Sequence, residues 1–161
     1  MGGNTTIAEE GIQMGHLLVI EDEPCIRDLF TTVLTAAGHV VRAAPDGQAG
    51  LEEALAQPPD LILLDLVMPG LDGLQVAARL RATPETAMVP LVMVTAWDAA
   101  LDRALAAGVD DFLRKPVDVG DLTLRVAALL AARAAMGVGD ALQRALAYVR
   151  SLDGVRHAAG R

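Results

Sequence analysis

Short apolar runs that each stop at a polar residue constrain the fold of this chain more than any other feature of its sequence. Three of them are four residues long, namely Leu17–Ile20, Leu61–Leu64 and Leu91–Val94. Because their apolar residues do not alternate with polar ones, both faces of each strand must be covered, which is typical of a parallel sheet. Shorter runs at Val40-Val41 and Phe112-Leu113 predict two further strands.

Helical patterns separate these runs. They lie at about residues 24–37, 46–57, 74–80, 101–106 and 119–135. In the first pattern, five apolar residues are expected on one face: Ile26, Leu29, Phe30, Val33 and Leu34. Strands that alternate with helices predict a doubly wound α/β fold with a five-stranded parallel sheet. Right-handed crossovers then bring the carboxyl ends of the strands to one edge, where such sheets bind ligands.

The length of 161 residues, of which 53% are hydrophobic, allows one good core. We expect a flexible lead-in at residues 1–15, one α/β domain at 16–135 and a C-terminal helical extension at 136–161. The extension has a glycine-rich start and then an apolar helical stripe, made of Leu142, Ala145, Leu146, Val149 and Leu152. Two interpretations stay open: a helix that packs on the body or on a partner chain, or a linker helix severed from an output domain.

Composition excludes several classes of function. The formal net charge of −8 argues against direct binding to nucleic acid, which requires clustered Lys and Arg. The single cysteine, Cys25, excludes an internal disulfide and is compatible with a reducing compartment. No apolar run reaches the length of a membrane-spanning helix, and the N-terminus does not read as a secretory signal. We therefore expect a cytoplasmic protein that is not in a membrane.

The predicted strand ends bring acids, a hydroxyl and the only lysine of the chain together. The first strand leads to Glu21 and Asp22, the third to Asp65, the fourth to Thr95 and the fifth to Lys115. Three carboxylates at one place repel one another unless a cation neutralises them. Magnesium is a hard cation that binds one or two carboxylates together with waters and phosphate oxygens. The compact charge of the lysine suits a phosphoryl oxygen or a carboxylate.

This set of groups predicts phosphoryl transfer to a carboxylate nucleophile. Asp65 would attack phosphorus, while the cation and Lys115 would offset the charge on the equatorial oxygens. The hydroxyl of Thr95 would fix the orientation of the phosphoryl group. Little else is required of the protein, because the energy comes from the phosphodonor.

Four sequence segments, in order and at compatible spacing, resemble the receiver domain of bacterial response regulators over roughly residues 16–135. They are LLVIEDEP at 17–24, PDLILLDLVMPGLDG at 59–73, VMVTA at 92–96 and GVDDFLRKP at 108–116. The resemblance implies a flavodoxin-like, chemotaxis-regulator-like fold with strand order 2-1-3-4-5 and five flanking helices. The C-terminal extension would add an extra helix.

The resemblance also assigns roles to the residues of the site. Asp65 is similar to the phosphoacceptor, and Glu21 and Asp22 to the acidic pair that holds Mg²⁺ or Mn²⁺. The backbone carbonyl of Val67 corresponds to the remaining protein ligand, and Lys115 to the phosphate-binding lysine. Glu21 stands where aspartate is commoner in the family, which lengthens one ligand arm and still permits a contact through water.

A conformational switch is implied by the same resemblance. Thr95 and Phe112 match the pair that moves on phosphorylation, after which helix 4, strand 5 and helix 5 would present an altered surface. Phe112 replaces the commoner tyrosine, so a hydroxyl is missing from the ring. Pro116 matches the position at which a cis peptide is expected. Val67 and Trp97, two residues after Asp65 and Thr95, flank the site, and we expect them to shield the phosphorylated aspartate from water.

A sensor histidine kinase or a histidine phosphotransfer protein is the partner that the resemblance implies. A homodimer through helix 4, strand 5 and helix 5 is a further expectation. Asp110, Asp111 and Arg125 lie in segments that resemble the charged dimer face of some family members. Ordinary solvated charge explains these three residues equally well.

Alternative functions fit the sequence less well. An aspartate-nucleophile phosphatase of the haloacid dehalogenase type needs a second aspartate two positions after the nucleophile, and Val67 stands there. A P-loop protein needs a glycine-lysine motif that the chain lacks. A receiver that binds partners without phosphorylation remains an alternative. We expect a signalling protein rather than an enzyme, either a stand-alone receiver or the receiver portion of a longer regulator.

Overall fold

The computed structural model describes residues 14–96 and 101–137 of the chain. Five strands form a single sheet. They are β1 (His16–Ile20), β2 (Val40–Ala44), β3 (Leu61–Asp65), β4 (Leu91–Thr95) and β5 (Asp111–Arg114). All neighbouring strands are parallel, and their order is β2-β1-β3-β4-β5. The predicted doubly wound fold and its strand order are therefore confirmed.

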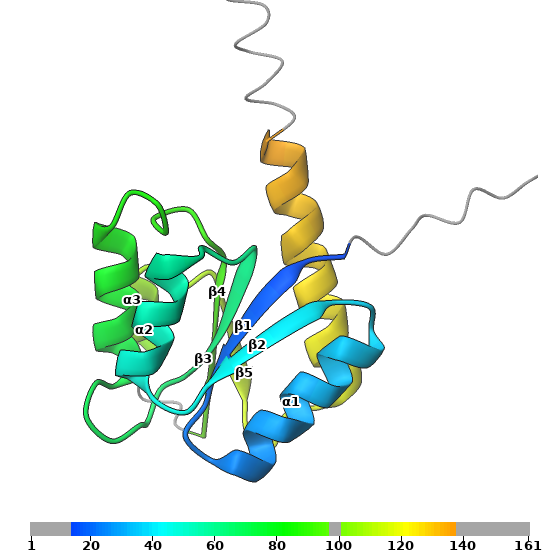
Figure 1. The fold of residues 1–161 in the computed structure, drawn as a ribbon, viewed down its shortest axis with the longest axis horizontal. Helices are drawn as coiled ribbons and strands as arrows, with labels where there is room; N and C mark the ends of the chain where they lie inside the picture. The colour runs from blue at the N-terminus through cyan, green and yellow to red at the C-terminus, as the bar shows by residue number, and fades with distance from the viewer. Residues whose placement is uncertain (1–13, 97–100, 138–161) are drawn as a thin grey trace, which may run out of the picture.

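Helices cover both faces of this sheet. They are α1 (Pro24–Ala36), α2 (Gly47–Ala56), α3 (Gly73–Ala82), α4 (Leu101–Ala106) and a C-terminal helix described over residues 119–137. In Figure 1, α2 and α3 lie on one face, and α1 and the C-terminal helix lie on the other. The last turns of the C-terminal helix project beyond the end of the sheet (Figure 1). Within the described residues, no helix is both long and apolar enough to span a membrane.

The continuous apolar runs divide between two cores, one on each face of the sheet. Successive residues of a strand point to opposite faces. In β1, Leu18 and Ile20 belong to the core under α2 and α3, whereas Leu17 and Val19 belong to the core under α1 and the C-terminal helix. Both cores require apolar side chains, which explains why the strands show no alternation with polar residues.

The boundaries of α1 follow local chemistry. Pro24 occupies its first turn, where a missing backbone N–H removes no helical hydrogen bond. Gly38, just beyond its end, has φ of 99°, a left-handed conformation that glycine adopts without strain. Phe30 and Leu34 are buried, but the prediction was wrong for Leu29, which is 47% exposed. Leu29 lies about 120° around the helix axis from the midpoint between those two residues, so it points past the edge of the core.

The C-terminal helix is longer than the sequence pattern predicted. An end near residue 135 was expected, with Gly137 loosening the chain, yet Met136 and Gly137 are both helical. A single glycine in a helix costs only about 1 kcal/mol relative to alanine, which the neighbouring helix formers offset. The rest of the predicted extension, residues 138–161, and the predicted lead-in up to residue 13 lie outside the described residues.

Candidate functional site

The register of the parallel sheet brings the predicted site residues to one edge. β1 and β3 are paired so that Glu21 and Asp65 extend from adjacent strand ends, with Asp22 next in the chain. Thr95 ends β4 beside Asp65, and Lys115 follows the last residue of β5. These five residues line one open cleft of about 460 Å³. The topology therefore gathers groups that are up to 94 positions apart in the chain.

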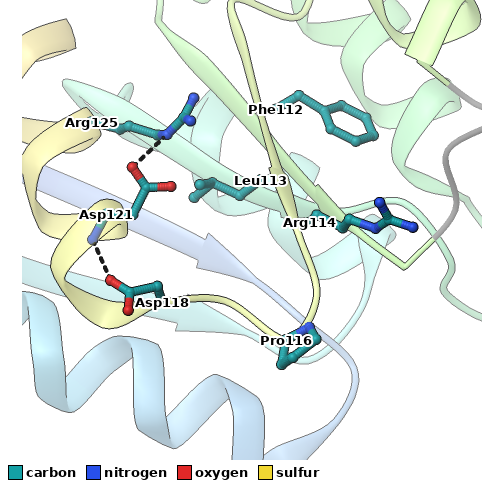
Figure 2. Close-up of a pocket in the computed structure, with 7 residues that line it drawn as sticks. All are labelled: Phe112, Leu113, Arg114, Pro116, Asp118, Asp121 and Arg125. Carbon is teal, nitrogen blue, oxygen red and sulfur yellow. Dashed lines mark hydrogen bonds and ion pairs between the residues drawn. The ribbon is translucent and has the colours of Figure 1, made fainter.

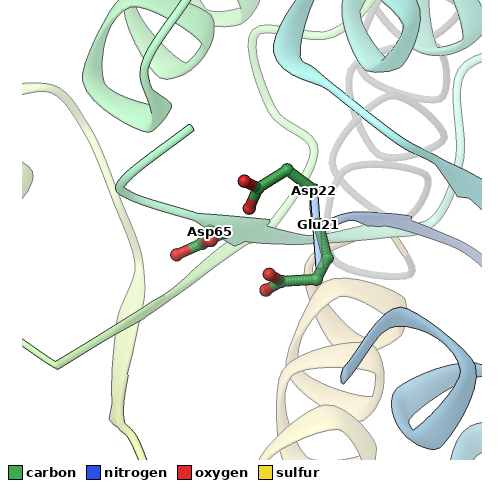
Figure 3. Close-up of side chains that lie close together, drawn as sticks. All are labelled: Glu21, Asp22 and Asp65. Atoms are coloured by element: carbon green, nitrogen blue, oxygen red, sulfur yellow. The ribbon is translucent and has the colours of Figure 1, made fainter. Parts of the chain in front are cut away.

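Three carboxylates form a compact cluster in this cleft. Glu21, Asp22 and Asp65 each offer an oxygen, and these atoms all lie within 4.8 Å of one another (Figure 3). Glu21 is 1% exposed and Asp65 is 5% exposed, whereas Asp22 is half-buried. A cluster made only of hard oxygen donors matches the ligand preference of Mg²⁺ and Mn²⁺. These residues could therefore hold a divalent cation.

Burial makes the negative charge of this cluster unfavourable. Desolvation, reinforced by the charge of Asp65, raises the pKa of Glu21 to about 7. Burial likewise raises the pKa of the Asp65 carboxyl, and the nearby Lys115 opposes part of that rise. A bound cation would relieve the repulsion and favour the charged form of both groups.

Lys115 lies between the two buried carboxylates. Its Nζ is 3.3 Å from Oε2 of Glu21 and 3.4 Å from Oδ2 of Asp65. Its backbone N–H donates to the carbonyl of Thr95 at 2.8 Å, which ties the segment after β5 to the end of β4. The peptide bond from Lys115 to Pro116 is cis, as the resemblance implied.

The loop after β3 brings its backbone close to the Asp65 carboxylate. The N–H of Val67 donates to Oδ1 of Asp65 at 3.4 Å, and the Val67 side chain is exposed at the cleft. The loop ends at Gly73, whose N–H donates to the carbonyl of Leu66 at 2.8 Å. Asp72 precedes it as the N-cap of α3 and forms a capping box with Gln75.

Gly73 was not singled out by the sequence analysis, although it belongs to the resembling segment. A Cβ atom built at this position would lie 2.4 Å from the carbonyl oxygen of Asp65 and 2.8 Å from Cα of Leu66. No side chain fits there unless the backbone around the candidate nucleophile shifts. The sequence offered only a weak indication of this close approach, namely that Gly73 directly follows Asp72, an aspartate suited to cap a helix.

Arg27 is a second residue that the sequence analysis missed. From α1 its Nη1 donates to the carbonyls of Glu21 and Asp22 at 3.0 and 3.4 Å. It therefore holds the backbone that presents two of the three acids. Because the acceptors are backbone atoms, no side-chain pattern in the sequence could have indicated these contacts.

The predicted switch residues lie on β4 and β5. Thr95 is buried at the cleft, whereas Phe112 is half-buried and packs against the core under α2 and α3. Leu113 packs into the opposite core, so the two side chains leave β5 on different sides (Figure 2). Trp97, which was expected to flank the site, lies outside the described residues.

The charged residues of the predicted dimer face are paired within the chain. Arg125 on the C-terminal helix contacts Asp111 at 2.8 Å and Asp121 at 2.9 Å. Asp110 contacts Arg81 at 2.7 Å. Arg125 borders a cavity of about 470 Å³ between β5 and the C-terminal helix, which Phe112 and Pro116 also line (Figure 2).

A doubly wound α/β domain with an acidic cleft at its carboxyl edge is the class that the fold and the site define. Residues 17–127 match the family model described as the response regulator receiver domain. The chain therefore belongs to the receiver domain family of two-component response regulators.

Individual relatives agree with this assignment. The chain is 43% identical over 119 residues to the DNA-binding dual master transcriptional regulator RpaA of Synechocystis sp., covering 73% of this chain and 49% of RpaA. It thus spans about half the length of several curated relatives that it matches. The structure of chemotaxis protein CheY4 of Vibrio cholerae is similar with a TM-score of 0.69 and 25% identity, covering 73% of this chain and 99% of CheY4.

One similar structure contains a metal. It is the receiver domain of the sensor histidine kinase PA1611 of Pseudomonas aeruginosa, with a magnesium ion coordinated in its active site cleft. The TM-score is 0.69 and the identity 27%, covering 74% of this chain and 99% of that domain.

Proposed function

We propose that Asp65 accepts a phosphoryl group from a sensor histidine kinase or a histidine phosphotransfer protein. A carboxylate oxygen of Asp65 forms a bond to phosphorus while the nitrogen–phosphorus bond of the donor phosphohistidine breaks. The bonding electrons stay on that nitrogen, and the imidazole leaves as a neutral ring that keeps the proton already on its other nitrogen. The observation that carries the proposal is the position of the Asp65 carboxylate, which lies in an open cleft 3.4 Å from Lys115 Nζ and beside two further acids.

Four groups of this chain would hold Mg²⁺ or Mn²⁺ in the cleft. They are the carboxylates of Glu21, Asp22 and Asp65 and the backbone carbonyl of Val67. The raised pKa of Glu21 and the closeness of the three acids support a cation there. When bound, the ion would offset negative charge on the phosphoryl oxygens.

Lys115 and Thr95 would position the transferred group. The ammonium of Lys115 already neutralises part of the charge of two buried acids. It is therefore suited to form an ion pair with an oxygen of the phosphoryl group once that group is bound to Asp65. The hydroxyl of Thr95 would donate to another phosphoryl oxygen. The only catalysis by the chain would be its own phosphorylation and dephosphorylation, and we place this signalling role in the cytoplasm.

Phosphorylation would shift the chain between two conformations. Thr95 would move toward Asp65, and the half-buried ring of Phe112 would fill the space that is vacated. The surface formed by α4, β5 and the C-terminal helix would change and could be read by a partner or by a second copy. Pairing through this surface would require the ion pairs of Arg125 with Asp111 and Asp121 to open or to be shared.

Intact-mass measurement with a small phosphodonor tests the acceptor chemistry. The purified chain is incubated with acetyl phosphate or phosphoramidate, first with Mg²⁺ and then with excess chelator. We expect a Mg²⁺-dependent gain of one phosphoryl group that is absent in Asp65→Asn. Asp28→Asn, which removes an exposed acid of α1 outside the cluster, is the matched control and should gain the group normally.

Two other results would point to other functions. No gain with either small donor, nor with a phosphorylated histidine phosphotransfer protein, would leave a domain that binds partners without phosphorylation. Steady turnover of a phosphate ester with release of inorganic phosphate would instead indicate an aspartate-nucleophile phosphatase.

A further inference from the structure

The guanidinium of Arg27 bonds to backbone and not to acids, although acids surround it in the chain. Within the described residues it forms no ion pair, even though Glu21, Asp22 and Asp28 all lie within six positions of it. Instead, its Nη1 donates to the carbonyl of Glu21 at 3.0 Å and to the carbonyl of Asp22 at 3.4 Å. Arg27 is half-buried, and hydrogen bonds from a charged donor are stronger than neutral ones. The contacts of this side chain therefore hold the backbone of residues 21 and 22.

The two carbonyls belong to the peptide units on either side of the Asp22 Cα atom. A peptide unit is planar, so a carbonyl that is held in place fixes the orientation of its whole unit. With both units fixed, the Cα–Cβ bond of Asp22 has one direction. The segment lies between the end of β1 at Ile20 and the start of α1 at Pro24, so no regular ladder of hydrogen bonds fixes it. In the described part of the chain, Arg27 is the donor to both carbonyls.

Asp22 depends on its backbone more than Glu21 does. Both oxygens of the Glu21 carboxylate accept hydrogen bonds, Oε1 from the backbone N–H of Glu23 at 3.2 Å and Oε2 from Lys115 Nζ at 3.3 Å. Among the residues that the structure describes, none donates to the carboxylate of Asp22. This carboxylate nevertheless lies with the other two acids of the cluster, within 4.8 Å of them (Figure 3). Its direction is therefore set by the backbone that Arg27 holds.

We propose that Arg27 is a positioning residue, which directs the Asp22 carboxylate toward the divalent cation of the cleft. This inference rests on the proposed function, because the cation belongs to that proposal. Groups that orient a metal ligand without touching the metal change metal affinity by roughly 10- to 100-fold when they are replaced. Arg27 thus raises the affinity of the cleft for a cation, although it is itself positively charged.

The charge of Arg27 and its contacts act on cation affinity in opposite directions. A guanidinium near the cleft repels a cation, so loss of the charge alone would tighten cation binding. Loss of the two hydrogen bonds frees the Asp22 backbone and would weaken cation binding. A general loss of stability changes neither, as long as the chain stays folded during the measurement. The sign of the change in affinity therefore identifies the role of Arg27.

Titration with Mn²⁺ alone, without phosphodonor, tests the proposal. The electron paramagnetic resonance signal of free Mn²⁺ measures the unbound ion and hence the dissociation constant, at one pH and ionic strength for all variants. Arg27→Met removes the donor, and we expect it to raise the dissociation constant by on the order of 10-fold. Arg27→Lys keeps the charge and a donor but loses the planar fork, so it should raise the dissociation constant by a smaller factor.

Arg79→Met is the matched control, because it removes the same charge from an exposed position of α3. It should bind Mn²⁺ as the unmodified chain does, and circular dichroism should show that each variant is folded. If Arg27→Met does not fold, Arg27→Lys decides alone, because its charge is unchanged and any weakening comes from the altered contacts.

Two kinds of failure are separable in this experiment. Binding of Mn²⁺ by the unmodified chain, with equal or tighter binding by the folded Arg27 variants, overturns the role of Arg27 and leaves the proposed function intact. Weakening by Arg79→Met that equals the weakening by the Arg27 variants also overturns it. Absence of Mn²⁺ binding by the unmodified chain would instead overturn the cation site of the proposed function.

Discussion

Two buried carboxylates share a single ammonium group at this site, and this arrangement makes the folded state sensitive to pH. Glu21 and Asp65 are both buried, and Lys115 contacts both of them. One positive charge is too little for two negative charges in a poorly solvated cleft. The same imbalance that disfavours the metal-free charged state makes a divalent cation a suitable ligand.

Replacement of Glu21 by glutamine should change how stability depends on pH. The pKa of Glu21 is about 7 in the folded chain, against 4.5 for a glutamate side chain exposed to water, so the unfolded chain releases this proton first as pH rises. The contribution of Glu21 to stability therefore falls between about pH 4.5 and 7 and stays low above that window. In chelator, Glu21→Gln should gain stability relative to the unmodified chain over this window, by on the order of 3 kcal/mol at most.

Urea denaturation at half-unit steps of pH measures this difference. A difference in unfolding free energy that is constant from pH 4.5 to pH 7 would contradict the argument. Glu52→Gln, which changes an exposed acid of α2 outside the cleft, is the control variant for the same substitution.

Gly73 has no side chain in the space that the backbone of Asp65, the proposed phosphoacceptor, closely occupies. Alanine at this position would place Cβ 2.4 Å from the Asp65 carbonyl oxygen, which is backbone and cannot rotate away. We expect Gly73→Ala to lower the free energy of unfolding by about 3 kcal/mol. Gly137→Ala is the control, because a Cβ there meets nothing within 4 Å and alanine favours the helix. Equal urea midpoints for Gly73→Ala and the unmodified chain would show that the loop can shift freely.

At the scale of elements, the strands and the candidate site residues at their ends were predictable because one physical cause sets both. A strand buried on both faces must be apolar throughout, and it must become polar where it leaves the sheet. The apolar runs that precede Asp65 and Thr95 therefore predict that both residues lie at the carboxyl ends of strands. Arg27 was not predictable, since its bonds to the carbonyls of Glu21 and Asp22 need no particular side chain as a partner. The spacing of apolar residues in α1 did not show which of them lie at the centre of the buried face; that centre is set by Phe30 and Leu34, and Leu29 lies about 120° from it.

Arg81 connects α3 to the segments on both sides of β4. Its Nε donates to the carbonyl of Gly108 at 2.8 Å, and its Nη1 donates to the carbonyl of Val89 at 2.7 Å. Its Nη2 contacts Asp110, whose Oδ2 also accepts from the backbone of Leu91. One side chain thus satisfies backbone groups before and after the strand that carries the proposed switch threonine.

Replacement of Arg81 by methionine should destabilise the domain. Several partly buried carbonyls would lose their donor, and Asp110 would lose its counter-charge. We expect a loss of about 2 to 3 kcal/mol, since hydrogen bonds to a charged group are stronger than neutral ones. Urea denaturation measures it, with Arg79→Met on the exposed side of the same helix as the control. A loss no larger than that of Arg79→Met would show that water replaces these bonds.

At the scale of the whole molecule, the strands that end at the cleft also contribute side chains to the cores on both faces of the sheet. Each of the four strand ends at the cleft belongs to a strand whose alternate residues enter the two cores. A movement of Thr95 or Phe112 therefore alters packing under α4 and beside the C-terminal helix.

Binding of Mg²⁺ should stabilise the whole domain in a pH-dependent way, because protons and the cation compete for the same carboxylates. At a Mg²⁺ concentration about 100-fold above its dissociation constant, the free energy of unfolding should rise by about 2.7 kcal/mol. The rise should be full at pH 8, where Glu21 with its pKa of about 7 is charged, and much smaller at pH 5.5, where it is protonated. Differential scanning calorimetry with and without Mg²⁺ measures the effect at both pH values. Asp22→Asn should remove most of it, whereas Asp28→Asn on α1 should retain it. Equal stabilisation at the two pH values would place the cation away from the three buried and half-buried acids.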